Sequence, residues 1–211
     1  MCRLLYVRSS EEFEISEYLG KFAEISKNSK EYQGHGWGFS FLKNGKWENY
    51  KNIKPIWEDN LSEFGKSKIV IAHARSAFQD KDIFVENNMP FYDDKTVFVF
   101  NGELRGVKIN AEGRIGAEKI YNFIKRFDKG DFSEALKKGI EIIDKRTEYI
   151  RAINIIVAEK EKAHVCCFYN EDPGYFNLKF KQTDKTLVIC SDSFTNETDW
   201  KLIGNKTTGV F

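Results

Sequence analysis

Apolar and polar positions along the chain change spacing in a regular order. Residues 2–7 predict a strand, and apolar residues at helical spacing from Phe13 to Ala23 predict an amphipathic helix, entered through a capping box at Ser9–Glu12. Alternating runs at 36–42 and 46–50 flank Lys43-Asn44-Gly45, which predicts a β-hairpin. Segments 68–74 and 96–100 are dense in β-branched and aromatic residues and predict buried strands.

The second half of the chain begins with helical patterns and then returns to strands. Helices are predicted over 115–127 and 132–144, where apolar residues repeat at helical spacing. Strands are predicted over 152–159, 163–169, 175–182, 185–191 and 207–211. Helices segregated beside largely antiparallel strands predict an α+β fold, and the absence of repeats and linkers predicts a single domain over residues 1–211.

Composition narrows the functional classes. The 211 residues include 33 Lys+Arg and 32 Asp+Glu, and a net charge of +1 provides no field that would favour nucleic acid or an anionic membrane. Hydrophobic residues make up 41% and charged residues 31%, which excludes a disordered chain. No apolar run approaches the roughly 18 residues of a spanning helix, and the start is too short in apolar residues for a signal peptide. We therefore expect a cytoplasmic protein that binds no membrane and no nucleic acid.

The cysteine pattern indicates neither a disulfide framework nor a metal or cofactor site. Four cysteines in a chain of this length without an export signal do not form a typical framework. Cys166 and Cys167 are adjacent, so in a strand they point to opposite faces. There is no CxxC motif and the three histidines are far apart in the sequence, so we expect no metal and no cofactor.

Cys2 is the most informative single residue. Removal of Met1 would place a thiol and a free α-amine on the same residue, and an α-amine has a pKa of about 7.7–8.0. That amine can accept the thiol proton, so nucleophile and general base need no separate side chains. The alternative is a small buried residue at the start of a strand.

Two further clusters carry groups suited to the same chemistry. Asn101-Gly102 follows the 96–100 strand, where we expect a turn, and an amide NH₂ beside a backbone N–H can stabilise an oxyanion. A plain Asn-Gly turn is the alternative. His73 and Arg75 lie two residues apart at the end of a predicted strand and thus on one face. A guanidinium there can bind a substrate carboxylate bidentately, although an arginine at the water boundary has the same pattern.

Taken together, six motifs resemble those of class II glutamine amidotransferases, which are N-terminal-nucleophile hydrolases, and the similarity extends over nearly the whole chain. The motifs occur in the family's order: MCRLL at the start, GWGFSF at 36–41, AHARSA at 72–77, NNMPF at 87–91, FNGEL at 100–104 and CSDSF at 190–194. The sequence is most similar to the small stand-alone members. The resemblance implies a four-layer αββα sandwich.

The resemblance also implies a role for each matching residue. Cys2 resembles the nucleophile, and Asn101 and Gly102 resemble the oxyanion-hole pair. Arg75 resembles the residue that binds the α-carboxylate of glutamine, with His73 in support. The remaining matches are the expected substrate-binding residues Ser76, Gly36 and Trp37 and the supporting residue Arg3.

The chain departs from the family pattern at the α-ammonium of the substrate. An aspartate at a helix start usually pairs with that ammonium, and the matching residue here is Gly116, followed by Ala117 and Glu118. An unpaired ammonium in a closed pocket is costly, so free glutamine should bind less tightly. Glu112 is one candidate replacement for this acid. The usual Asp before Gly-Trp-Gly is His35, and the usual His before Pro-Phe is Met89.

The leading hypothesis is an amidohydrolase that acts on the side-chain amide of glutamine or a γ-glutamyl compound through a thioester on Cys2. Transfer of the released ammonia would require a separate ammonia-accepting synthase. The alternative is a binding or sensor module, or a regulatory subunit, that keeps the fold without turnover. Aromatic residues at Trp57 and Phe91-Tyr92 either line the substrate pocket or pack a homodimer face, and both remain open.

Overall fold

The computed structural model describes residues 1–211, whose strands form two antiparallel sheets. The larger sheet has the order β11-β9-β10-β1-β4-β2-β3, and the smaller has the order β12-β8-β7-β6-β5. The strands of the larger sheet are β1 (Arg3–Glu14), β2 (Trp37–Lys43), β3 (Lys46–Asn52), β4 (Lys66–Ala74), β9 (Lys179–Gln182), β10 (Thr186–Cys190) and β11 (Lys201–Leu202). Those of the smaller sheet are β5 (Phe91–Tyr92), β6 (Val97–Val107), β7 (Thr147–Ala158), β8 (Ala163–Cys167) and β12 (Thr207–Val210).

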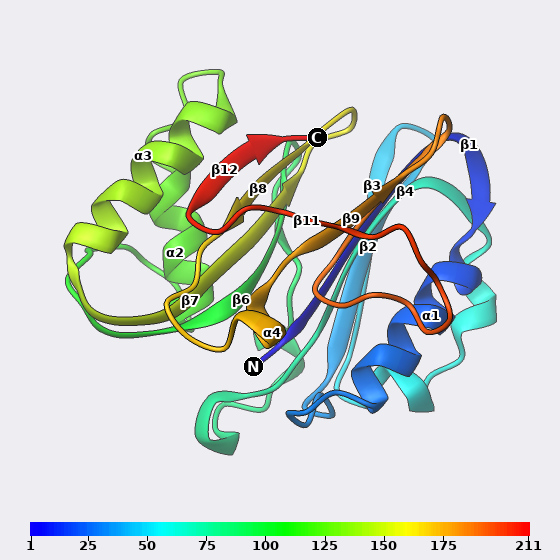
Figure 1. Ribbon diagram of the computed structural model, residues 1–211, viewed down its shortest axis with the longest axis horizontal. Coiled ribbons are helices and arrows are strands. Elements are labelled where there is room, and N and C mark those ends of the chain that lie inside the picture. The colour runs from blue at the N-terminus through cyan, green and yellow to red at the C-terminus, as the bar shows by residue number, and fades with distance from the viewer.

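The three long helices, α1 (Ile15–Lys27), α2 (Gly116–Lys125) and α3 (Phe132–Lys145), lie on the outer faces of the two sheets (Figure 1). The one-turn helix α4 (Pro173–Phe176) lies beside the N-terminus, and 3₁₀ turns occur at Ile56–Glu58, Leu61–Phe64, Phe78–Asp80 and Val85–Asn87. In Figure 1 α1 covers the larger sheet, whereas α2 and α3 cover the smaller one. This confirms the predicted α+β class and the four-layer αββα arrangement. No helix has the length and apolarity needed to cross a membrane.

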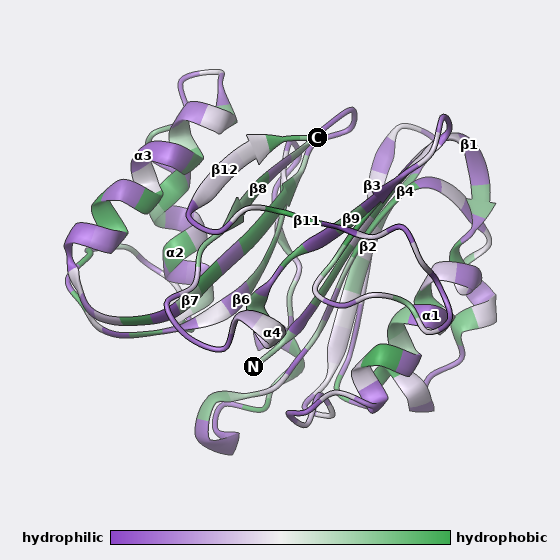
Figure 2. Ribbon diagram, in the orientation of Figure 1, coloured by the Kyte–Doolittle hydropathy of each residue, from purple (hydrophilic) through white to green (hydrophobic).

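The period-two alternation of the strands divides the core in two. Leu5 and Val7 of β1 pack with Leu19 and Phe22 of α1, in a cluster of 17 buried residues. Leu4 and Tyr6 face the other way and belong to a cluster of 35 buried residues that includes the smaller sheet, α2 and α3. Figure 2 shows the corresponding apolar stripes along the strands, with polar residues on the outer faces of the helices. The space between the sheets is therefore lined by alternate residues of each strand.

Most predicted elements are present, and the hairpin has the expected turn. Asn44 and Gly45 join β2 to β3 with φ of 52° and 73°, the left-handed pair of a type I′ turn. The predicted strand at 68–74 is β4, and the predicted helices at 115–127 and 132–144 are α2 and α3.

The predicted capping box at Ser9–Glu12 is wrong. These residues extend β1, and the backbone N–H of Ser10 donates to Lys185 O at 2.9 Å. α1 begins only at Ile15 and has no side-chain cap. Pairing with the neighbouring strand supplies the backbone partners that a cap would have supplied, so the strand continues.

Other boundaries also differ from prediction, and the strand predicted at 152–159 begins at Thr147. The segment at 175–182 begins with the end of the one-turn helix α4, and only Lys179–Gln182 form a strand. The strand predicted at 96–100 continues to Val107, because β7 pairs with it along its whole length. The expected turn at Asn101-Gly102 is therefore wrong, and both residues lie inside β6.

Candidate active site

Strand alternation brings Cys2 and Arg75 to the same face of the larger sheet. Arg3 pairs with Ala74 in the β1–β4 register, so the next pair along the ladder is Cys2 with Arg75. His73 pairs with Leu4, which belongs to the core between the sheets, so His73 faces the same space. The prediction that His73 and Arg75 share a face is confirmed.

The Cys2 thiol lies against the backbone of Ser76. The N–H of Ser76 donates to Sγ at 3.5 Å, and Sγ lies 3.6 Å from Ser76 O. Burial raises the pKa of the thiol, whereas the positive N-terminus, the Ser76 N–H and the Arg75 guanidinium act in the opposite direction. The surroundings thus combine an apolar environment with groups that favour the thiolate. Ser76 contributes these contacts through its main chain.

Arg75 is a buried cation without a carboxylate partner. It is 6% exposed, and its guanidinium donates to Asp82 O at 2.8 Å and Asn88 Oδ1 at 3.4 Å. No carboxylate oxygen lies within 4.0 Å of it, and burial lowers its pKa. Buried guanidinium groups are normally paired with an acid. The Arg75 guanidinium is therefore paired only with neutral oxygens within the protein.

Gly36 and Gly38 allow the Asn88–Pro90 segment to cross β2 closely. A Cβ on Gly36 would lie 2.2 Å from Asn88 Nδ2, and one on Gly38 would lie 2.6 Å from Met89 O. Gly36 O also accepts from the N–H of Arg75 at 2.9 Å. The glycines therefore fix the segment that supplies Asn88 to Arg75.

The structure does not bring Trp37 to this site. Its fully buried ring stacks on Phe39 in the core beneath α1, and its indole N–H donates to Asp59 at 2.9 Å. Trp37 lies between Gly36 and Gly38 in a strand, so it must point to the opposite face from theirs.

His73 is buried between the sheets and neutral. Its pKa is lowered to about 3, chiefly by burial and secondarily by the charges of Arg75 and Lys51. Neither ring nitrogen has a hydrogen-bond partner within the protein. His73 is therefore an uncharged polar group two residues from Arg75.

Asn101 faces the same space from the opposite sheet. Phe98 stacks on Tyr121 of α2, so Asn101, three residues further along β6, points away from the helices and toward the larger sheet. Asn101 is fully buried, and neither its Oδ1 nor its Nδ2 has a partner. A free amide donor therefore lies in the space between the sheets.

Gly102 is a position where no side chain fits. A Cβ added there would lie 2.1 Å from Ala152 O and 2.7 Å from the Phe100 ring. Contact with the β7 backbone thus requires glycine directly after Asn101.

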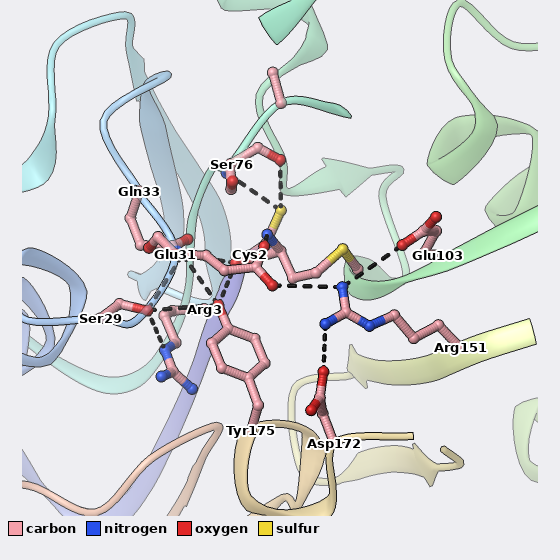
Figure 3. A network of polar contacts seen from close by, with 12 residues as sticks. Cys2, Arg3, Ser29, Glu31, Gln33, Ser76, Glu103, Arg151, Asp172 and Tyr175 are labelled. Carbon is pink, nitrogen blue, oxygen red and sulfur yellow. Dashed lines mark hydrogen bonds and ion pairs between the residues drawn. The ribbon is translucent and has the colours of Figure 1, made fainter. Parts of the chain in front are cut away.

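A polar network surrounds the chain terminus next to Cys2 (Figure 3). The α-ammonium of Met1 pairs with Glu31. The Met1 carbonyl accepts hydrogen bonds from Gln33 Nε2 at 2.6 Å and from the Tyr175 hydroxyl. Arg151 lies 3.4 Å from Glu31 and also pairs with Asp172. Sequence reasoning missed Glu31, Gln33, Arg151, Asp172 and Tyr175, which come from three separate segments and carry no local motif.

Arg3 supports this network from below. It is 4% exposed, donates to Ser29 Oγ at 3.1 Å and Ser191 O at 3.0 Å, and lies 4.2 Å from the centre of the Tyr175 ring. Its expected structural role agrees with these contacts.

Of the two acids near the start of α2, Glu118 is engaged in an ion pair and Glu112 is not. Gly116 is exposed, and nothing lies within 4 Å of a Cβ built there. Glu118 is paired with Arg114, whose guanidinium holds the pKa of that carboxyl below its usual value. Glu112 is exposed. No cluster of three or more metal-ligating side chains is present in the chain.

Comparisons with solved structures identify the fold. A glutamine aminotransferase class-II domain protein from Silicibacter pomeroyi superposes with a TM-score of 0.70 at 11% identity, over 99% of this chain and 94% of that one. A predicted glutamine amidotransferase from Pseudomonas aeruginosa gives 0.63 at 14% identity, over 100% and 97%. Glutamine phosphoribosylpyrophosphate amidotransferase from B. subtilis gives 0.65 at 18% identity, over 90% of this chain and 42% of that one.

Sequence comparison adds nothing to this, because no family model and no curated protein matches the chain. The chain has the fold of class II glutamine amidotransferase domains.

Proposed function

We propose that the chain is a cysteine-dependent amidohydrolase of the N-terminal-nucleophile type, acting on the side-chain amide of glutamine or a γ-glutamyl compound. The observation that carries the proposal is the buried, unpartnered amide of Asn101, which faces the space that Cys2 and Arg75 face from the other sheet. An unpartnered buried polar group lowers stability, by about 1–3 kcal/mol. An amide left free at this place is available to bind the oxyanion of a transition state.

The reaction begins with loss of Met1, which frees the α-amine of Cys2. The amine takes the thiol proton, and the thiolate attacks the amide carbonyl to form the C–S bond. Asn101 Nδ2 and the Gly102 N–H donate to the oxyanion. The protonated amine then gives its proton to the leaving nitrogen as the C–N bond breaks, and water hydrolyses the thioester to a carboxylate and the regenerated thiol.

Arg75 would hold the α-carboxylate of the substrate. Its planar guanidinium can form two parallel hydrogen bonds to a carboxylate, and it has no such partner within the protein. Ser76 would stabilise the thiolate through its N–H, and Gly36 would position Arg75 through the backbone.

Release of the product requires no partner in this scheme. Transfer of ammonia would require a separate synthase. We also propose that the protein is cytoplasmic and forms a homodimer. No cofactor enters any step.

One observation favours the second candidate, a non-catalytic binding module. With Met1 attached, the Cys2 nitrogen is part of a peptide bond, and burial raises the pKa of its thiol. A chain that keeps Met1 would have neither a free amine nor an activated thiol and would bind its ligand at Arg75 without turnover.

The test is a turnover assay that follows ammonia from glutamine and amine from γ-glutamyl amides. The proposal predicts product formation by protein that has lost Met1 and none by Cys2→Ala, which is processed in the same way because alanine is also small. Equal product from both proteins would exclude Cys2 as the nucleophile.

A further inference from the structure

Met1 occupies a formed binding site beside Cys2. Its ammonium pairs with Glu31, and its carbonyl accepts two hydrogen bonds, from Gln33 and Tyr175. Its side chain packs against the buried cluster of Ala152, Tyr175 and Phe176. The residue thus shows what this space binds: a primary ammonium close to a carbonyl, with an apolar body.

The polar wall of this space is preorganised. Gln33 is fully buried, its Nε2 also donates to Glu31 O at 2.7 Å, and its Oε1 has no partner. Burial raises the pKa of the Tyr175 hydroxyl to about 12, so it stays a hydrogen-bond donor. When Met1 leaves, the hydrogen-bonding groups of Gln33 and Tyr175 lose Met1 as a partner but stay held by their other contacts.

The space also has a negative balance of charge once the Met1 ammonium has gone. Three carboxylates, those of Glu31, Glu103 and Asp172, surround the single Arg151 guanidinium. The exposed Arg105 pairs with Glu103 from outside, and Lys30 acts on Asp172 from a distance. The Arg3 guanidinium over the Tyr175 ring is itself paired with Asp192. Coulombic attraction therefore favours a cationic occupant over an anionic one.

The position of the space matches the leaving side of the scissile amide. Glu103 directly follows Asn101 and Gly102 on β6. The Ala152 carbonyl, which leaves no space for a side chain at Gly102, belongs to a residue of the apolar cluster against which Met1 packs. Figure 3 shows Ser76 on one side of Cys2, with Arg151 and Asp172 on another. A substrate whose carboxylate lies at Arg75, near Ser76, would thus extend its amide substituent toward Glu31.

We propose that the space vacated by Met1 is a leaving-group subsite that selects γ-glutamyl amides of short diamines, with Glu31 binding their free ammonium. The inference rests on the proposed function. The C–S bond forms at Cys2, the C–N bond breaks, and the diamine leaves with the proton that the Cys2 amine returns; water then hydrolyses the thioester. The aspartate missing at Gly116 would have bound the α-ammonium of the substrate. Glu31 would instead bind the free ammonium of the diamine.

The experiment compares three amides of similar size on protein that has lost Met1. They are the γ-glutamyl amides of ethylenediamine, propylamine and glycine, which end in an ammonium, a methyl group and a carboxylate. The kcat/KM of the ethylenediamine amide should exceed that of the propylamine amide by about tenfold or more, because only the former can form a charged hydrogen bond to Glu31. The glycine amide should be the poorest substrate, because its carboxylate would be repelled.

Glu31→Gln tests the residue, with the exposed Glu134→Gln on α3 as the matched control. In Glu31→Gln the ratio of the ethylenediamine amide to the propylamine amide should fall to near one, whereas in Glu134→Gln it should stay as in the parent protein. Equal loss with both amides would mean that Glu31 acts on the Cys2 amine and would overturn the subsite.

The outcomes separate this inference from the proposed function. Equal hydrolysis of all three amides overturns the subsite and leaves the amidohydrolase standing. Hydrolysis of none, together with none of glutamine, overturns both.

Discussion

Asn101 of β6 and Asn154 of β7 lie directly opposite each other, and only the side-chain amide of Asn154 is hydrogen-bonded within the protein. Asn154 donates to Phe176 O at 2.6 Å and accepts from the N–H of Phe168 at 3.2 Å. Asn101 is equally buried and has no partner for either amide atom. Of these two buried asparagines, Asn154 therefore stabilises the fold through its hydrogen bonds, whereas the amide of Asn101 is available to a ligand.

Asn101→Ala should lower kcat by about 10²–10³, because one donor to the oxyanion is lost. It should leave the free energy of unfolding unchanged or higher, since no hydrogen bond within the protein is broken. Asn154→Ala is the control, and it should destabilise the protein by about 1–3 kcal/mol. Kinetics and urea unfolding measure both, and full activity in Asn101→Ala would contradict its assignment to the oxyanion.

Gly102→Ala should reduce both activity and stability, because the added methyl group would lie 2.1 Å from Ala152 O and the β6 backbone must move. Gly174→Ala, where a Cβ meets nothing within 4 Å, is the control and should be nearly neutral. Thermal unfolding and turnover provide the comparison. A normal melting temperature with normal turnover in Gly102→Ala would show that this contact does not constrain the site.

Arg75→Lys should raise KM by about ten- to a hundredfold with a smaller change in kcat, because lysine keeps the charge but loses the bidentate fork. The exposed Arg126→Lys is the matched control and should leave KM unchanged. Steady-state kinetics over a range of glutamine or γ-glutamyl amide concentrations give the split. A change confined to kcat would argue against binding of a substrate carboxylate at Arg75.

Much of this arrangement follows from strand alternation alone. The shared face of His73 and Arg75 could be predicted from their spacing, and so could the buried strand that carries them. The same period places Trp37 on the face opposite to Gly36, so its position beneath α1 was available from the sequence once β2 was assigned. The hairpin at Asn44-Gly45 was fixed by local turn chemistry.

Other features depend on partners that are remote in sequence. β6 continues through Asn101 because β7 pairs with it, and an Asn-Gly signal for a turn gives way to that pairing. β1 likewise continues through Ser9 to Glu14, because it pairs with β10 and β4. The Glu31–Arg151 contact joins residues 120 positions apart, so no local pattern could predict it.

Stability should fall as the pH is lowered from about 6.5 toward 3, and His73 should account for part of the slope. Its folded pKa of about 3 lies below the value of 6.5 for an unperturbed imidazole, so in that range the unfolded chain binds a proton that the folded chain does not. The free energy of unfolding therefore rises with pH across this window. Urea unfolding at pH 7, 5 and 4 should show a shallower slope in His73→Gln than in the parent protein, and identical slopes would contradict the assignment of a neutral, buried His73.

In the proposed mechanism Cys2, freed of Met1, is an activated N-terminal nucleophile. The most direct measurement is the intact mass of the protein after incubation with a diazo-ketone analogue of glutamine, beside Cys2→Ala. We expect a chain lacking Met1 that carries one adduct, and no adduct on the Cys2→Ala control. A chain that retains Met1, or one that loses Met1 and gains no adduct, would contradict it.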